Sequence, residues 1–327
     1  MHPKAAFAPS ICSLLLTAAL AGCLRESGPP AGPVVAPPAA PKPPEPGWPR
    51  TFRDDMGSEF TLDGPAQRIV SLAPAATEIM YALGIESRLV GRTDFCDYPP
   101  AAKQKPSVGG YTNPNIERIV DLKPDLVLAM HGLPQELADR LTQLGLRVYG
   151  ANEGSADEVL ESIVTVGDLT GAEEPARRLT NSMRERLAAI AAAGKGASRR
   201  CRAVYVVDAE SGHVAGPGTF VDDLLTRAGA TNIASDALTS WPKLSPEAVA
   251  EGDPEIIFVG PAPQAPERSA ERLAEVLAGK PGWSPTTAVR NRRVVGVDED
   301  LVTLPGPRLV EGLEAMAKAV RAVVRDG

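Results

Sequence analysis

The sequence predicts an α/β protein of two similar lobes, each with a central parallel sheet, joined by one long α-helix. The main observation is an internal repeat: residues 116–128 return, shifted by 130 positions, as residues 246–258. Each copy reads as a short helix, a turn of proline and acid, and an apolar run of strand length. A second observation is that a long segment without turn signals, Glu173 to Ala193, separates the copies.

The first half of the chain alternates short apolar runs with helix-forming segments. The predicted strands are 67–72, 88–91, 125–130 and 146–149, and the predicted helices are 73–83, 114–122 and 133–144. Gly84 and Gly145 end two of these helices. Strands that alternate with helices through short turns are typical of a parallel sheet covered on both faces.

The middle of the chain is strand-poor. Leu179, Met183, Leu187 and Ile190 recur every three or four residues, which predicts one amphipathic helix. Some 20 residues at 1.5 Å each span about 30 Å, so the helix would be a stiff connection between the lobes. We therefore expect a rigid cleft with small opening motions.

The second half repeats the alternation. Its predicted strands are 203–207, 256–258 and 294–297, and its predicted helices are 219–228, 246–252, 267–278 and 307–324. We divide the folded chain into a first lobe at 52–168, a joining helix at 169–199 and a second lobe at 200–327. A ligand cleft is expected between the lobes.

The N-terminus predicts export. Residues 1–22 combine Lys4, a short apolar core and small residues before Cys23, as in a signal peptide. Leu20-Ala21-Gly22-Cys23 resembles a bacterial lipobox, which predicts lipidation of Cys23; an ordinary secretory peptide is the alternative. Residues 23–51 hold ten prolines and few aliphatic residues, so we expect a disordered tether that reaches roughly 80 Å from a membrane.

Composition restricts the partners. The formal net charge is −7, and −8 once residues 1–22 and Lys4 are removed, which disfavours nucleic acid and anionic lipid. We expect the lipid anchor to be the protein's only membrane contact. Cys96 and Cys201 could pair in an oxidising compartment, but their separation favours two separate thiols.

The repeat places one glutamate on each lobe. Glu117 and Glu247 each lie seven residues before the proline of their copy. Each could be an ordinary surface carboxylate of a helix. Two matched charges instead favour docking onto a partner that is itself two-fold symmetric.

The chain resembles the class III substrate-binding proteins of ABC importers for vitamin B12, ferric siderophores and haem, and looks most like the vitamin B12-binding branch. The motifs that carry the resemblance are Arg68-Ile69-Val70-Ser71-Leu72-Ala73-Pro74-Ala75-Ala76-Thr77-Glu78, Cys96-Asp97-Tyr98-Pro99-Pro100, Val108-Gly109-Gly110-Tyr111, the segment 116–127, and Trp241-Pro242-Lys243-Leu244-Ser245-Pro246-Glu247. The resemblance implies two Rossmann-like lobes, a monomeric carrier, and contact of Glu117 and Glu247 with arginines of a permease dimer. The ligand is then cargo and no resident cofactor is expected.

Candidate ligand contacts follow the predicted strands, where loops at the carboxyl ends of a parallel sheet bind ligands. They are Phe95, Tyr98, Tyr111, Met130, His131, Trp241 and Arg308. Aromatic rings suit the broad apolar face of a corrinoid, and the resemblance places Phe95, Tyr111 and Trp241 at such contacts. Met130 stands where the resemblance implies an aromatic residue, which leaves the exact corrinoid open.

Three alternatives stay open. His131 and His213 could be axial ligands of haem iron or corrinoid cobalt, although solvated loop histidines are more common, and no closed metal site is expected. A ferric siderophore would need cations in the cleft, with Arg92, Arg140 and Arg308 as candidates. An exported α/β hydrolase is the distant alternative, but the chain lacks Gly-x-Ser-x-Gly and His-Glu-x-x-His motifs, so we do not expect an enzyme.

Overall fold

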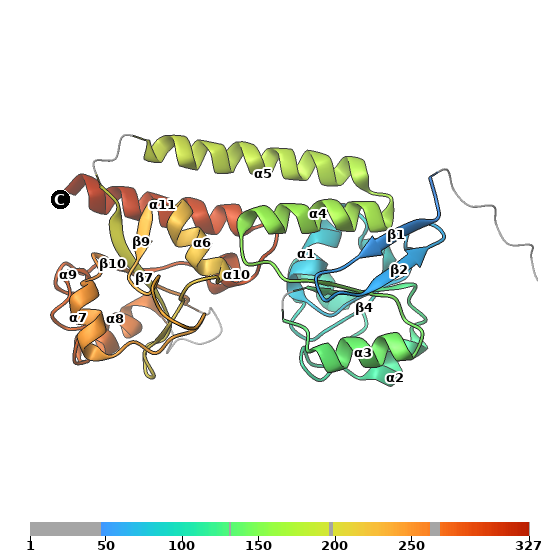
Figure 1. The fold of residues 1–327 in the computed structure, drawn as a ribbon, viewed down its shortest axis with the longest axis horizontal. Coiled ribbons are helices and arrows are strands. Elements are labelled where there is room, and N and C mark those ends of the chain that lie inside the picture. The colour runs from blue at the N-terminus through green and yellow to red at the C-terminus, as the bar shows by residue number, and fades with distance from the viewer. Residues whose placement is uncertain (1–46, 131, 196–198, 262–268, 327) are drawn as a thin grey trace, which may run out of the picture. The chain divides into compact units, whose positions relative to one another are not determined.

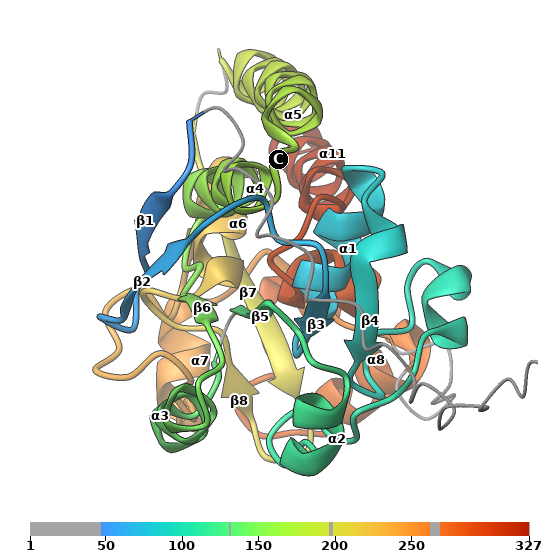
Figure 2. The same ribbon diagram turned by 90° about the vertical axis from the view of Figure 1, so that its right-hand side faces the viewer.

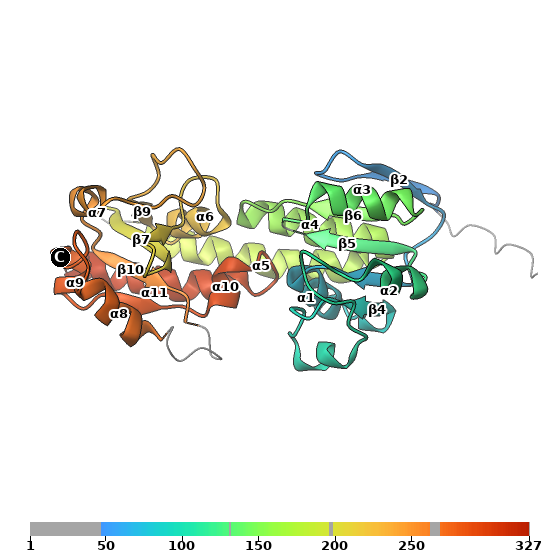
Figure 3. The ribbon, with the colours of Figure 1, turned by 90° about the horizontal axis from the view of Figure 1, so that it is seen from below.

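The computed structural model describes residues 47–130, 132–195, 199–261 and 269–326. Within these residues, a four-stranded and a five-stranded sheet with flanking helices confirm the predicted α/β class (Figures 1 and 3), and a separate two-stranded sheet precedes them. The predicted signal peptide, Cys23 and most of the predicted tether lie outside the described residues.

The first lobe holds a four-stranded parallel sheet in the order β4-β3-β5-β6. Its elements are β3 (Ile69–Ser71), α1 (Pro74–Ala82), η1 (Glu86–Arg88), β4 (Leu89–Arg92), η2 (Pro100–Gln104), α2 (Ile116–Asp121), β5 (Leu126–Met130), α3 (Gln135–Gln143), β6 (Val148–Ala151) and α4 (Ala156–Thr170).

Side chains of the central strand β5 alternate between two apolar layers. Leu126, Leu128 and Met130 join the core beneath α1 and α4, whereas Val127 and Ala129 join the core on the α2 and α3 side. All five residues are buried. A strand covered on both faces must be apolar throughout, which explains the uninterrupted apolar run in the sequence.

An antiparallel hairpin precedes this sheet, and its first strand begins within residues 23–51, which were predicted to be tether. β1 (Arg50–Arg53) pairs with β2 (Glu59–Leu62). Trp48 is buried against Phe52, at 6.1 Å between ring centroids. Arg50 lies over the Trp48 ring and donates to Glu173 at 2.8 Å. Residues 48–51 therefore belong to the folded lobe, because a buried ring and an ion pair anchor a segment that looks like tether by composition.

The second lobe holds a sheet in the order β11-β10-β7-β8, with β9 also paired to β7. Its pairs are parallel except β7 with β8. Its elements are β7 (Cys201–Asp208), β8 (His213–Val214), α6 (Phe220–Arg227), β9 (Ala230–Asn232), α7 (Pro246–Gly252), β10 (Ile256–Val259), α8 (Ala270–Ala278), α9 (Thr287–Arg290), β11 (Val294–Gly296), α10 (Glu299–Thr303) and α11 (Leu309–Asp326).

The sequence repeat is also a structural repeat. In both sheets the repeated strand is central: Leu126 of β5 pairs with Ile69 of β3, and Ile256 of β10 pairs with Ala203 of β7. The turn before each repeated strand contains a residue with positive φ, Lys123 at 46° or Asp253 at 32°. The two copies thus share register and backbone as well as composition.

A hydrogen-bond network closes the turn before the repeated strand in each lobe. In the first lobe Asp125 accepts hydrogen bonds from the backbone N–H groups of Gln67 and Arg68, at 2.8 and 3.0 Å. The Arg68 guanidinium then donates to the carbonyls of Leu122 and Lys123 at the end of α2.

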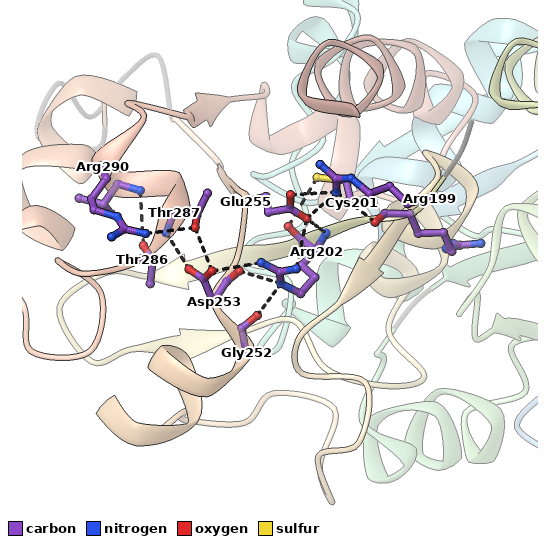
Figure 4. A network of polar contacts seen from close by, with 11 residues as sticks. Arg199, Cys201, Arg202, Gly252, Asp253, Glu255, Thr286, Thr287 and Arg290 are labelled. Atoms are coloured by element: carbon purple, nitrogen blue, oxygen red, sulfur yellow. Dashed lines mark hydrogen bonds and ion pairs between the residues drawn. The ribbon is translucent and has the colours of Figure 1, made fainter. Parts of the chain in front are cut away.

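The second lobe repeats this network with an added ion pair. Glu255 accepts from the backbone N–H of Arg202 at 3.0 Å and pairs with Arg199 at 2.8 Å (Figure 4). The Arg202 guanidinium donates to the carbonyls of Gly252 and Asp253 at the end of α7. The carboxylate that follows each repeated proline therefore ties the repeated helix to the strand beside it.

The long helix α5 (Glu173–Gly194) connects the two lobes, as predicted. α4, α5 and α11 lie together on one side of the sheets (Figures 1 and 2). One continuous apolar core includes Ile163 of α4, Met183 and Ile190 of α5, and Leu313 of α11. Arg186 of α5 also donates twice to Glu314 of α11, at 2.8 and 2.9 Å. Packing and a bidentate ion pair thus fix α5 to both lobes.

The two cysteines of the folded region are separate, as expected. Cys96 and Cys201 are both buried and both free. Burial raises the pKa of the Cys201 thiol to about 11, so this thiol is unreactive at neutral pH. Within the described ranges, no helix has the length and apolar character needed to span a membrane.

Candidate functional site

The first sheet changes direction at its centre, and a cavity lies there. The chain runs from β3 outward to β4 and then returns to β5 on the other side of β3. The loops that follow β3 and β5 therefore diverge at the carboxyl ends of the strands, which is where open α/β sheets bind ligands. Ala73 and Gly132, which follow these two strands, line a cavity of about 580 Å³ together with Leu304 and Pro305 of the second lobe.

The walls of this first cavity are mainly apolar. Three of the predicted contacts, Phe95, Tyr111 and Met130, line it. Phe95 is 62% exposed, whereas Met130 is fully buried at the end of β5. The Tyr111 hydroxyl donates to the Met130 carbonyl at 3.2 Å. Burial raises the pKa of Tyr111 to about 12, so it is a neutral phenol whose ring faces the cavity.

A second cavity of about 380 Å³ adjoins the first, since Gly132 lines both. Both lobes contribute to its wall. Its lining residues are Gly132, Asn152, Glu153, Gly154 and Glu158 of the first lobe, and Gly218, Thr219, Phe220, Val221, Ser240, Trp241 and Thr303 of the second. The predicted contact Trp241 is thus found here, with Phe220 as a second aromatic ring.

The loop that presents Trp241 is held against β8. Backbone N–H groups of Val214 and Gly216 donate to the carbonyls of Pro242 and Ser240, at 3.0 and 2.8 Å. A Cβ at Gly216 would lie 2.7 Å from Cδ of Pro242, so the close approach requires glycine. Trp241 remains 47% exposed between these two hydrogen bonds. The loop backbone is therefore positioned while the indole stays available.

Tyr98 and Arg308 contact each other instead of lining these two cavities. The Arg308 guanidinium carbon lies 3.7 Å from the centroid of the Tyr98 ring. The same guanidinium donates to both oxygens of Glu78 on α1, at 2.6 and 3.0 Å. Arg308 precedes α11, so this pair connects the two lobes. As a free cation for an anionic ligand, Arg308 was predicted wrongly, because a buried carboxylate already neutralises it.

The proposed axial pair of His131 and His213 stays a prediction, because only His213 belongs to the described residues. His131 lies outside them. His213 is exposed on β8, and its Nδ1 lies 2.7 Å from Oγ of Ser211, which donates to Asp208. His213 lines neither of the two cavities. No group of three or more histidine, cysteine, aspartate or glutamate side chains arranged for a metal occurs in the part of the chain that is described.

Glu117 and Glu247 occupy equivalent exposed positions. They lie in the first turns of α2 and α7, whose N-caps Asn115 and Ser245 accept from the backbone at 2.9 and 3.2 Å. Both helices lie on the side of the sheets away from α5 (Figures 1 and 2). Among the described residues, neither carboxylate has an ion-pair partner.

The most unusual residue of the site is Glu153, which was not predicted. It is 1% exposed, and neither of its carboxyl oxygens has a hydrogen-bonding partner among the described residues. Burial raises the pKa of this carboxyl to about 7. Its position after β6, at a strand's carboxyl end, is the sequence signal that could have identified it. Phe220 carried no such signal, because it begins a helix and does not follow a strand. Only the folding of the second lobe brings the start of α6 to the second cavity.

Comparison with known proteins agrees with this geometry. Residues 69–301 match the periplasmic binding protein family. A cobalamin-binding protein of Halobacterium salinarum is 35% identical over 278 residues, which cover 83% of this chain and 74% of that protein.

Two solved structures share the fold. The vitamin B12-binding protein BtuF of Vibrio cholerae has a TM-score of 0.68 and 27% identity, over 79% of this chain and 98% of that one. The haem-binding protein RhuT of Roseiflexus has a TM-score of 0.70 and 26% identity, over 79% and 99%. With its two lobes, its joining helix and its inter-lobe cavities, this chain belongs to the periplasmic binding protein family, the substrate-binding proteins of ABC importers for vitamin B12, haem and siderophores.

Proposed function

We propose that this protein captures a corrinoid of the cobalamin type between its lobes and delivers it to an ABC importer. The observation that carries the choice of ligand is the charge of the two cavities. Among the described residues, no lysine or arginine lines either cavity, whereas Glu153 and Glu158 line the second. Ferric catecholate siderophores are anionic chelates and haem carries two propionates, so both would lack a counter-charge here.

The apolar face and the polar rim of a corrinoid match the apolar first cavity and the more polar second cavity. The corrinoid macrocycle is broad and apolar, and its rim carries neutral amides. The first cavity offers apolar and aromatic walls, including Phe95 and Tyr111, while the second adds Asn152, Thr219 and Ser240. Ring faces contribute through buried area, and a few polar groups at the rim set orientation.

Delivery would use the two exposed acids. Glu117 and Glu247 stand at the starts of matched helices on the side away from α5. Such a pair would meet the two halves of a permease dimer symmetrically, and its attraction would weaken with salt. We further propose that Cys23 is lipidated and tethers the exported protein to a membrane.

The test of ligand identity is a titration of the purified protein with cyanocobalamin, haemin and an anionic ferric catecholate. Absorbance of the ligand and calorimetry report binding directly. We expect saturable one-to-one binding of cyanocobalamin and weaker binding of the two iron ligands. A protein that binds haemin tightly and ignores cyanocobalamin would refute the proposal.

A further inference from the structure

We propose that Glu153 selects ligands by their rim: it hydrogen-bonds an uncharged N–H donor of the bound molecule and excludes a carboxylate from the same place. The inference rests on the proposed corrinoid function and specifies which group of the corrinoid is recognised. It starts from one observation, a buried carboxyl group that lies beside a cavity and has no hydrogen-bonding partner among the described residues.

Glu153 is placed by the end of a strand. β6 ends at Ala151, and the chain then turns through Gly154 to Ser155, whose hydroxyl caps α4. The Gly154 N–H is already taken by Glu158 at 2.7 Å. Glu153 lies in this turn, and its side chain forms part of the wall of the second cavity.

An unpartnered buried carboxyl group is costly. Removing a polar group from water without replacing its hydrogen bonds costs about 1–3 kcal/mol, and more for a charge. Protonation reduces this cost, which is consistent with a pKa raised to about 7 by burial. The Ser162 hydroxyl and the backbone N–H of Glu153 lower the pKa only in part, and neither lies in hydrogen-bonding geometry to the carboxyl oxygens. The group therefore remains available to a ligand that can supply a hydrogen bond.

The surroundings of Glu153 determine which ligand group fits. The charged groups that act on it are two acids, Asp55 and Glu158, and both raise its pKa. It in turn raises the pKa of two phenols, Tyr111 and Tyr149. Among the described residues that line the second cavity, none is a lysine or an arginine. A carboxylate of the ligand would meet acids on several sides, whereas an amide N–H would find acceptors.

Contact requires a small movement. The carboxyl oxygens of Glu153 are covered in this structure, although the side chain lines the cavity. Rotation about the side-chain bonds would turn the carboxyl group toward an amide that enters the second cavity. The hydrogen bond gained on binding would then offset part of the free-energy cost of burying the Glu153 carboxyl group.

The experiment compares two corrinoids that differ at the rim. Dicyanocobinamide carries neutral amides, and dicyanocobyrinic acid carries carboxylates in their place. Dissociation constants are measured at pH 8 for the wild-type protein, Glu153→Gln, Glu153→Leu and the control Glu161→Gln. Glu161 is an exposed acid of α4 that does not line the second cavity, so its variant removes the same charge elsewhere.

We expect wild-type protein to prefer the amide ligand by at least about tenfold, since one hydrogen bond to a charged group corresponds to such a factor. Glu153→Leu should bind the amide ligand about tenfold more weakly. Glu153→Gln should keep most of the amide affinity and bind the carboxylate ligand more tightly than wild type does. Glu161→Gln should behave as wild type.

Two results would overturn the inference in different ways. If wild type binds both corrinoids and the two Glu153 variants keep its preference, Glu153 is not the selecting residue and the proposed function stands. If wild type binds neither corrinoid, the proposed function fails together with the inference. Should Glu153→Leu not fold, the gain in carboxylate binding by Glu153→Gln decides alone.

Discussion

Removing one partner of the ion pair between Glu78 and Arg308 should cause a large loss of folding stability. This pair joins α1 of the first lobe to the start of α11 in the second, with two hydrogen bonds of 2.6 and 3.0 Å. Side-chain exposure is 4% for Glu78 and 16% for Arg308. Arg308→Met would leave a carboxylate that is almost fully buried without a partner. Breaking a buried pair in this way costs about 3–5 kcal/mol.

The pH dependence of this loss follows from the direction in which burial shifts the pKa of Glu78. Burial is the largest effect on Glu78 and raises its pKa, while Arg308 lowers it. Removal of Arg308 leaves the raising effect unopposed. A carboxyl with a raised pKa is stabilised below its unfolded pKa and loses that stability as the pH rises. The Arg308→Met variant should therefore be least stable, relative to wild type, at neutral and alkaline pH.

Urea unfolding followed by circular dichroism measures the free energies. The set comprises Arg308→Met, Glu78→Met, the double variant, and the control Arg140→Met, which removes an exposed arginine of α3. The double variant should recover most of the loss, because apolar residues of similar volume can replace a buried pair. Arg140→Met should change stability by less than about 0.5 kcal/mol.

Two outcomes would refute this reasoning. One is a loss below about 1 kcal/mol for both single variants, the value of an ordinary surface pair. The other is a double variant whose loss equals the sum of the single losses, which would mean that the two side chains do not interact. Reduced corrinoid affinity with unchanged stability would instead return Arg308 to the ligand site.

Three further predictions concern the cleft and the docking face. Wild type should lose stability between pH 4.5 and 8, because a carboxyl whose pKa is raised to about 7 in the folded state destabilises that state as the pH rises. Glu153→Gln should remove this loss, which is at most on the order of 3 kcal/mol. Parallel profiles of stability against pH for the two proteins would contradict the prediction. Trp241→Ala should weaken cyanocobalamin binding by about 2 kcal/mol, as for a buried aromatic anchor, and an unchanged affinity in calorimetry would exclude Trp241 from the site. Combined Glu117→Ala and Glu247→Ala should leave ligand affinity intact and reduce uptake, so normal transport by that double variant would disprove docking through these acids.

Much of the cleft could be predicted because its residues follow strands. Phe95, Tyr111 and Met130 were chosen from positions near predicted strand ends, and all three line the first cavity. Parallel strands place their carboxyl ends at one edge, so a correct strand assignment brings such residues together. Trp241 was chosen on the same ground, the resemblance supported it together with Phe95 and Tyr111, and it lines the adjoining cavity.

The errors share a different cause. Arg308 was treated as available, but its partner Glu78 lies 230 positions away in the chain. Residues 48–51 were assigned to the tether, but Arg50 reaches Glu173 at the start of α5. Neither partner is suggested by local composition or periodicity, because ion pairs between distant segments leave no regular pattern in the sequence.

By itself, the sequence determined the class of fold, the two-lobe plan and the equivalent positions of Glu117 and Glu247. The reason is that strand and helix periods, and a repeat shifted by 130 positions, are properties of the chain alone. Only the tertiary structure decided that Arg308 is neutralised and that Glu153 is buried without a partner among the described residues. Burial and charge pairing depend on which distant segments meet, and that information arises only when the lobes close around a common core.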